Sequence, residues 1–308
     1  MRHLPAALAA LLLLASASAC DTDDGPCVDA WGRDCEELTL PAINEVAVPA
    51  GEAAIGCNAV LDADCKDSEK PQHLATVPAF SIDRLEVTVE DFVSFLGARE
   101  GDPTECGGGP CFKEAGQDLP YEELSDGVWT AVDGTQRRPA TQVTWYGAEA
   151  YCAWMEQRLC SEAEWEKAAR GGCELYSDCL TETRTYPWGE EAPSEACTRT
   201  VWQTSADPGC GTWHPLDVGG RPDGASPYGA QDMSGNVWEW VADRAHPSFE
   251  GAPTDGSVWT AGGIGVFRMV RGGGGLGTED EVRAGRRADG GPTDGTPWRG
   301  LRCCRDTD

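Results

Sequence analysis

The chain has 308 residues, of which 52 are acidic and 24 are basic, and its formal net charge is −28. An acidic surface of this kind repels nucleic acid and anionic lipid, and no basic patch in the sequence compensates for it, so we expect no nucleic-acid partner. The charge favours cations such as calcium, or basic partners, although acidity also keeps a secreted protein soluble without any binding role.

The first twenty residues, MRHLPAALAALLLLASASAC, have the composition of an export signal. A basic start precedes an apolar run from Leu4 to Leu14, which is too short to span a bilayer because that takes about 20 apolar residues. Two interpretations stay open. One is ordinary cleavage after Ala19, and the other is a bacterial lipoprotein signal, in which Cys20 is acylated as the new N-terminus.

These features predict the domain organisation and the location of the protein. We expect a signal peptide over residues 1–19, a lipid-anchored polar linker over 20–41 and one domain over 42–308. No later hydrophobic run is long enough to cross a membrane. The prediction is an exported protein of the bacterial cell envelope, in the periplasm or at the outer surface, that meets the membrane through its lipid anchor alone.

Few segments of the domain are periodic enough for regular secondary structure. Short strands are expected over Glu45–Pro49, Ala75–Asp83 and Phe267–Arg271, with a small hairpin around Val128–Val132. Three helices are predicted, each after a capping residue: Thr88 before Val89–Arg99, Thr144 before Trp145–Gln157, and Ser161 before Glu162–Arg170. Together with 38 glycines, 20 prolines and 12 tryptophans, this pattern indicates an α+β domain that is irregular, loop-rich and low in regular secondary structure.

The cysteines agree with an oxidising compartment. The chain has 15, and setting Cys20 aside leaves an even number, as a fully paired chain requires. Several lie close together in sequence, which favours structural disulfides: Cys27/Cys35, Cys57/Cys65, Cys106/Cys111, Cys173/Cys179 and Cys197/Cys210. A zinc site would need C-x-x-C pairs or nearby histidines, and the histidines are scattered.

Several motifs occur in a specific order: Pro139–Trp145, Arg158–Gly172, Tyr186–Gly189, Ser226–Asp243, Val270–Gly273 and Gly300–Cys303. In this order the set resembles the formylglycine-generating enzyme (sulfatase-modifying factor) family over residues 42–305. The resemblance implies a C-type-lectin-like fold.

The segment Asp232-Met-Ser-Gly-Asn-Val-Trp-Glu239 places two carboxylates around a Gly-Asn turn, and hard cations prefer mixtures of carboxylate and backbone oxygens. By the resemblance, Asp232 and Glu239 would give side-chain oxygens, and Gly235 and Val237 carbonyl oxygens, to one structural calcium. The alternative is a turn packed by its neighbouring tryptophans.

The resemblance also implies disulfide pairs. Cys152 and Cys303 fall where the family joins its central helix to the C-terminus. Cys160 replaces a proline that is usual in the family and is a natural partner for Cys304.

The expected chemistry is missing from the motif that should carry it. Formylglycine-generating enzymes oxidise a substrate cysteine with oxygen and copper(I), which soft thiolates bind. Their serine position falls here on Gly274, and their two thiol positions fall near Gly277 and Val282. No cysteine occurs between Cys210 and Cys303, so we expect no catalytic residue and no copper. A related branch makes sulfoxides with iron held by a histidine triad of an additional N-terminal helical domain, and four scattered histidines do not supply that triad.

Two functions are therefore weighed. The first is a non-catalytic binding or scaffold module for a protein or glycan ligand at the cell surface, with Gly274, Arg283, Arg286 and Arg287 lining an old substrate groove. For these arginines, salt bridging with the many carboxylates is an equally good interpretation. The second is a formylglycine-generating-type oxidase that acts on a partner's cysteine, with thiols brought from elsewhere in the fold.

Overall fold

A computed structural model describes residues 44–60, 62–99, 104–113, 119–123, 128–182, 184–205 and 207–307. All of them belong to one unit, Pro41–Asp308, which alone is considered below. The predicted signal peptide, Cys20 and the Cys27/Cys35 pair lie outside the described residues. Within the described part of the chain, no helix has both the length and the apolar character that a membrane span requires.

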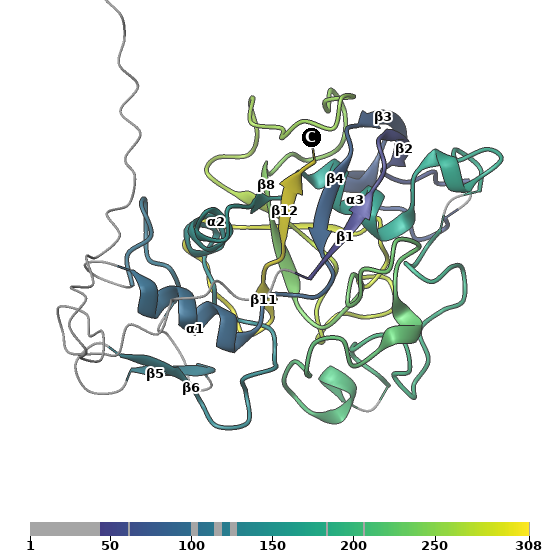
Figure 1. The fold of residues 1–308 in the computed structure, drawn as a ribbon. Helices are drawn as coiled ribbons and strands as arrows, with labels where there is room; N and C mark the ends of the chain where they lie inside the picture. The colour runs from purple at the N-terminus through teal and green to yellow at the C-terminus, as the bar shows by residue number, and fades with distance from the viewer. Residues whose placement is uncertain are drawn as a thin grey trace, which may run out of the picture. The chain divides into compact units, whose positions relative to one another are not determined.

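One sheet brings the two ends of the domain together (Figure 1). Its order is β1 (Glu45–Val48), β4 (Phe80–Asp83), β12 (Cys303–Asp306) and β7 (Arg158–Leu159), and all its neighbouring strands are antiparallel. Val46, Val48, Phe80 and Ile82 alternate with more exposed residues and are buried. Strand alternation of this kind marks a sheet with one face against the core.

A second sheet contains parts of three of the six sequence motifs, those over Ser226–Asp243, Val270–Gly273 and Gly300–Cys303. Its order is β10 (Arg287–Gly290), β9 (Arg268–Arg271), β8 (Trp238–Arg244) and β11 (Arg299–Gly300), and only β8 and β11 run parallel. Two hairpins complete the strands: β2 (Gly51–Ile55) with β3 (His73–Val77), and β5 (Tyr121–Glu123) with β6 (Trp129–Ala131).

The three predicted helices are confirmed as α1 (Val89–Ala98), α2 (Trp145–Trp154) and α3 (Glu162–Arg170). Each predicted cap accepts a hydrogen bond from the backbone of the first turn: Thr88 from Asp91, Thr144 from Gly147, and Ser161 from Glu164. Helix α2 ends three residues before the predicted Gln157, because Glu156 takes a positive φ of 57°. Short 3-10 turns cover Asp67–Glu69, Cys173–Leu175, Pro208–Gly211 and Pro222–Gly224.

The predicted strand Ala75–Asp83 is in fact two strands, β3 and β4, which belong to different sheets. Pro78 separates them, since a proline has no N–H to donate to a strand ladder. The hairpin expected around Val128–Val132 is present as β5 and β6.

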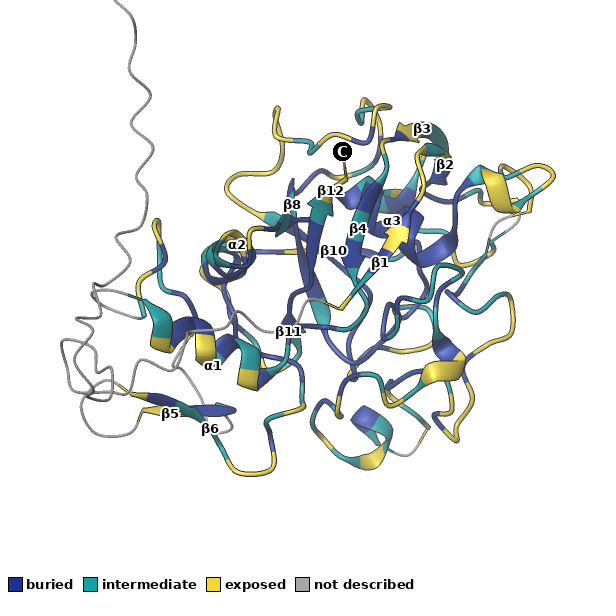
Figure 2. Cartoon of the chain, in the orientation of Figure 1, coloured by how far each residue is buried: buried dark blue, intermediate teal, exposed yellow. Residues whose placement is uncertain are grey.

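Aromatic side chains fill the larger core, as the composition predicts. Helices α1 and α2 pack with the β5–β6 hairpin around Phe92, Phe95, Tyr121 and Tyr151, whose ring centroids lie 5.5–6.0 Å apart. A second cluster packs α3 against β1, β4 and β9. Buried residues follow these elements in Figure 2, while the connecting loops carry most of the exposed ones.

Six disulfides join all twelve cysteines of the described residues. Four are the local pairs expected from spacing. The other two, Cys152–Cys303 and Cys160–Cys304, are the pairs that the family resemblance implies, and they close separations of 151 and 144 residues. The two bridges join adjacent residues of β12 to α2 and to the residue after β7. If one bridge is removed, the other therefore still closes nearly the same long loop.

This redundancy predicts how the two long bridges share stability. Replacing Cys152 and Cys303 with alanine should lower the free energy of unfolding by about 2–3 kcal/mol, since the remaining bridge leaves only a short loop to open. The same loss is expected for Cys160 and Cys304. Removing all four should cost about 7 kcal/mol, more than the sum of the two. Urea unfolding of the three variants measures this, and simple additivity would contradict it.

Candidate functional site

The glycine segment after β9, Gly272–Gly275, is buried and lines no open groove. The N–H of Gly275 donates to Asn236, and its carbonyl accepts from the N–H of Gly209. A Cβ at Gly275 would lie 2.2 Å from the Trp298 ring, and one at Gly274 would meet both Trp238 and Trp298. Only glycine fits beneath this indole at position 275, so Trp298 occupies the space beside the family's serine position.

The residues at the two positions expected for thiols serve turn formation and packing. Gly277 donates its N–H to Gly274 in a tight turn, and a Cβ there would come 2.9 Å from the Gly274 oxygen. Val282 is fully buried in a small cluster with Tyr186 and Trp202. The segment that would carry the oxidase chemistry therefore presents packed apolar groups.

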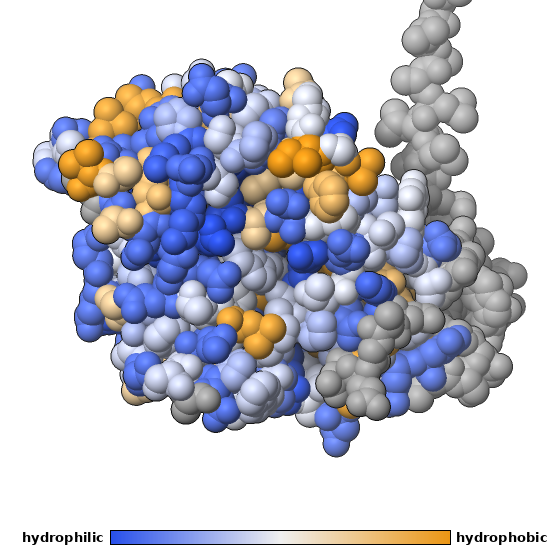
Figure 3. All heavy atoms as spheres, turned by 180° about the vertical axis from the view of Figure 1, so that it is seen from behind, coloured by the Kyte–Doolittle hydropathy of each residue, from blue (hydrophilic) through white to orange (hydrophobic). Residues whose placement is uncertain are grey.

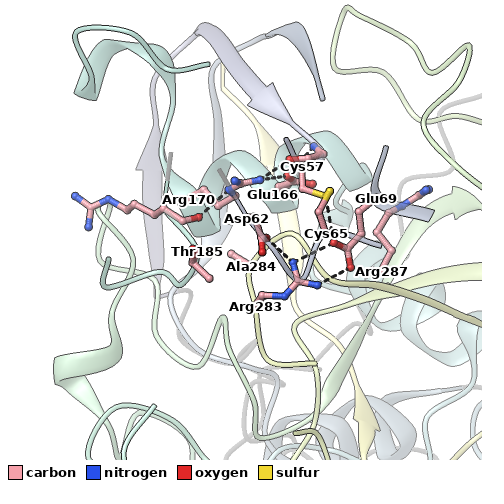
Figure 4. A network of polar contacts seen from close by, with 12 residues as sticks. Cys57, Asp62, Cys65, Glu69, Glu166, Arg170, Thr185, Arg283, Ala284 and Arg287 are labelled. Atoms are coloured by element: carbon pink, nitrogen blue, oxygen red, sulfur yellow. Dashed lines mark hydrogen bonds and ion pairs between the residues drawn. A yellow bond between two sulfur atoms is a disulfide. The ribbon is translucent and has the colours of Figure 1, made fainter. Parts of the chain in front are cut away.

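The interpretation of Arg283 and Arg287 as groove residues is wrong, because both are buried in ion pairs. Figure 4 shows Arg283 between Asp62 and Glu69, with N···O distances of 2.8 and 2.9 Å. Arg287 binds both oxygens of Glu162 at 2.6 and 2.8 Å. The buried carboxylates need these cations, since an unpaired buried charge costs several kcal/mol.

The other two residues of the predicted groove are placed differently. Arg286 is partly exposed and lies 3.5 Å from Glu69. Gly274 is buried beside Trp238 and Trp298. The four residues therefore do not line one open surface.

A connected network lies beneath β9. Arg271 spans Glu162 and Glu166 at 2.8 Å each, and Asp243 accepts the N–H groups of Glu162 and Trp259. Burial and the charge of Glu162 raise the pKa of Asp243 to about 7. Burial opposes ionisation of Glu162 too, but Arg287 and Arg271 outweigh it and lower its pKa. Asp243 is thus the group of this network that titrates near neutrality.

The residues predicted to bind calcium lie in a buried carboxylate cluster whose cation is an arginine. Arg302 contacts both oxygens of Glu239 at 2.7 Å, and Trp165 donates its indole N–H to the same carboxylate at 2.6 Å. Asp232 accepts the N–H of Gly219. Glu86 faces both carboxylates, and its pKa is raised well above the usual range by burial and by the charges of Asp232 and Glu239.

This geometry does not fit a calcium ion as the motif predicted it. Calcium takes six to eight oxygen ligands, whereas both Glu239 oxygens already accept strong donors. The N–H groups of Gly235 and Val237 donate to Gly272 and Glu86, and these bonds leave the carbonyl oxygens, which are the predicted ligands, unaffected. Experiment has to decide between the calcium that the motif predicts and Arg302, which is the competing cation at Glu239.

One open pocket has no counterpart among the sequence predictions. It has a volume of about 410 Å³, and three segments line it: Leu119 and Pro120 with Val132, Thr135, Arg138, Pro139 and Thr141; Thr212–Pro215; and Pro297. Pro297 adjoins Trp298, and Thr212 follows the turn that bonds to Gly275, so the pocket borders the closed glycine segment. Motif reasoning missed it because its residues come from three segments without a shared pattern.

Comparisons with known proteins agree with this fold. A family model described as "Sulfatase-modifying factor enzyme 1-like domain" matches residues 33–307. A hercynine oxygenase of Mycolicibacterium thermoresistibile is 32% identical over 264 residues, 79% of this chain and 54% of its own. A formylglycine-generating enzyme of Streptomyces coelicolor is 29% identical over 86% of this chain and 90% of its own. The chain spans about half the length of the hercynine oxygenases it matches.

A solved structure gives the same picture. PvdO from Pseudomonas aeruginosa superposes with a TM-score of 0.65 and is 26% identical, over 85% of this chain and 94% of its own. The sequence-based assignment of family and fold is confirmed.

The raised pKa of Asp243 predicts a pH-dependent stability. The folded protein favours the neutral form of Asp243. The stability that Asp243 contributes is therefore fully present below about pH 4 and is lost as the pH rises through about 7. Asp243→Asn should flatten the dependence of unfolding free energy on pH across this window, by on the order of 4 kcal/mol. The exposed Asp223→Asn is the control, and equal slopes in the two variants would refute the assignment.

The carboxylate cluster predicts that calcium does not stabilise the fold. Melting temperatures in millimolar calcium and in chelator should be the same, because Arg302 supplies the positive charge at Glu239. A rise with calcium that is lost in Asp232→Asn would instead establish the predicted ion.

Proposed function

We propose, on the premise that this chain belongs to the sulfatase-modifying factor enzyme 1-like family, that it is a non-catalytic binding or scaffold module. The observation that carries the proposal is the glycine segment: Gly277 and Val282 stand at the thiol positions, and the Trp298 ring covers Gly275. Neither glycine nor valine binds copper or exchanges with a substrate thiol.

The disulfides support the proposal from a second direction. Each described cysteine has a disulfide partner, so none of them offers a thiolate near Gly274. A disulfide sulfur is neither a nucleophile nor a ligand for copper(I). An oxidase would therefore have to open one of these bridges before it could bind the metal.

We propose further that the protein is exported and lipid-anchored at Cys20 in the bacterial cell envelope. The apolar run and Ala17-Ser-Ala-Cys20 support this location, and so does the dense pairing of cysteines, which persists in oxidising compartments.

The alternative function is an oxidase acting on a cysteine of a partner protein. It draws on the relatives named hercynine oxygenase and formylglycine-generating enzyme. It needs at least two unpaired cysteines near the glycine segment. Thiol chemistry therefore separates the two functions.

Alkylation of the denatured, unreduced protein distinguishes them. The chain without residues 1–20 should show no adduct by intact mass, since its 14 cysteines are expected to form seven disulfides. Gly277→Cys with Val282→Cys provides the positive control and should gain two adducts if the new thiols stay unpaired. Two or more adducts in the unmodified sequence would overturn the non-catalytic function and, once mapped, locate the reactive thiols.

A further inference from the structure

Basic side chains without a partner are rare among the described residues of this acidic protein, and one of them lines the open pocket. Among the described lysines and arginines, three have neither a hydrogen bond nor an ion pair for their side chains: Lys113, Arg137 and Arg138. Arg138 lines the open pocket, and Arg137 is its exposed neighbour. With 52 acidic residues in the chain, a guanidinium that none of them pairs with is suited to an anionic ligand.

The rim of this pocket presents Trp213, which is the one tryptophan among the large exposed hydrophobic residues of the described part of the chain. Trp213 is 66% exposed, although indole rings are usually buried in large part. It takes a positive φ of 62°, in a turn where its N–H donates to Pro208 and the Thr212 hydroxyl donates to Gly209. The backbone strain of a non-glycine residue there costs about 1–3 kcal/mol, and the turn holds the ring toward solvent.

His214 adds a hydrogen-bond acceptor. Its Nδ1 lies 2.9 Å from the carbonyl oxygen of Pro215, so Nδ1 carries the proton that is donated to this oxygen. In the neutral ring, Nε2 is then left to accept a hydrogen bond. A ligand hydroxyl is a suitable donor.

The pocket walls are poorly suited to the backbone of a peptide. The N–H groups of five wall residues already donate within the protein: Val132, Thr135, Arg138, Thr212 and Trp213. Four other wall residues are prolines, which have no N–H: Pro120, Pro139, Pro215 and Pro297. Recognition in the pocket therefore relies mainly on side chains: the charge of Arg138, the acceptor of His214 and the aromatic face of Trp213.

These features fit one class of ligand, and the inference rests on the proposed binding function. We propose that the pocket binds an acidic sugar residue of a glycan, with the carboxylate on Arg138, a ring hydroxyl on His214 and the apolar face of the sugar ring against Trp213. The volume of about 410 Å³ lies in the range of small-ligand sites. Figure 3 shows one face of the molecule, on which hydrophilic residues predominate and hydrophobic residues form a few small patches.

The proposal is tested with the chain without residues 1–20 and two matched tetrasaccharides, one that contains glucuronate and one of neutral glucose. Titration calorimetry and ligand-observed NMR should detect the acidic oligosaccharide and not the neutral one. Arg138→Gln and Trp213→Ala should each weaken binding about tenfold or more, as loss of one charged or stacking contact implies. Arg137→Gln is the matched control: it removes the same charge one residue away, outside the pocket, and should change affinity less than about twofold.

Other outcomes decide against the proposal. Equal weakening by Arg137→Gln and Arg138→Gln would show non-specific attraction to positive charge. Binding of a short peptide with a free C-terminal carboxylate, but of neither sugar, would assign the pocket to a protein ligand. Absence of sugar binding would remove this ligand while leaving the non-catalytic function in place if the alkylation finds no free thiols.

Discussion

The buried ion pair between Glu239 and Arg302 is the contact on which the other parts of the domain depend. Glu239 lies in β8 of one sheet, and Arg302 lies between β11 and β12, which belong to different sheets. Arg302 also donates to the carbonyl oxygens of Asp83 and Gln231. The Arg302 guanidinium thus bonds to β8, to the end of β4 in the first sheet and to the turn before β8. Loss of either partner would leave an uncompensated buried charge, which typically costs 3–5 kcal/mol.

The same requirement explains why most of the arginines are unavailable for ligands. Glu69, Glu162 and Glu166 are buried, and each is neutralised by an arginine from the segment 271–287. A chain so rich in acids can bury carboxylates only by using its few cations inside. Arg138 is notable for this reason: it stands apart from these networks and borders open space.

The closed glycine segment and the open pocket are neighbours with opposite character. Trp298 packs on Gly275, and the preceding residue, Pro297, forms part of the pocket wall. In formylglycine-generating enzymes, as the resemblance implies, the segment would carry copper-binding thiols. The fold can keep its shape without them, since its ion pairs and disulfides lie elsewhere. Shared architecture therefore says little about shared chemistry in this family.

The sequence by itself determined the features that depend on residues close together in the chain. Thr88, Thr144 and Ser161 mark the helix starts because a cap bonds to a backbone N–H only three residues away. Short cysteine spacings identify local disulfides for the same reason, and the ordered motifs identify the family. The absence of thiols at Gly277 and Val282 is also a property of sequence alone.

Only the tertiary structure decided which distant groups meet. Arg283 pairs with Glu69 across 214 residues, and no local pattern distinguishes this arginine from one that lines a groove. Arg302 pairs with Glu239, one of the two carboxylates that the motif assigned to calcium, because β8 and the C-terminal segment converge there. The exposure of Trp213 and the pocket beside it likewise arise from three separate segments. Electrostatic partners and cavities depend on the positions of all neighbouring segments, which periodicity and spacing do not encode.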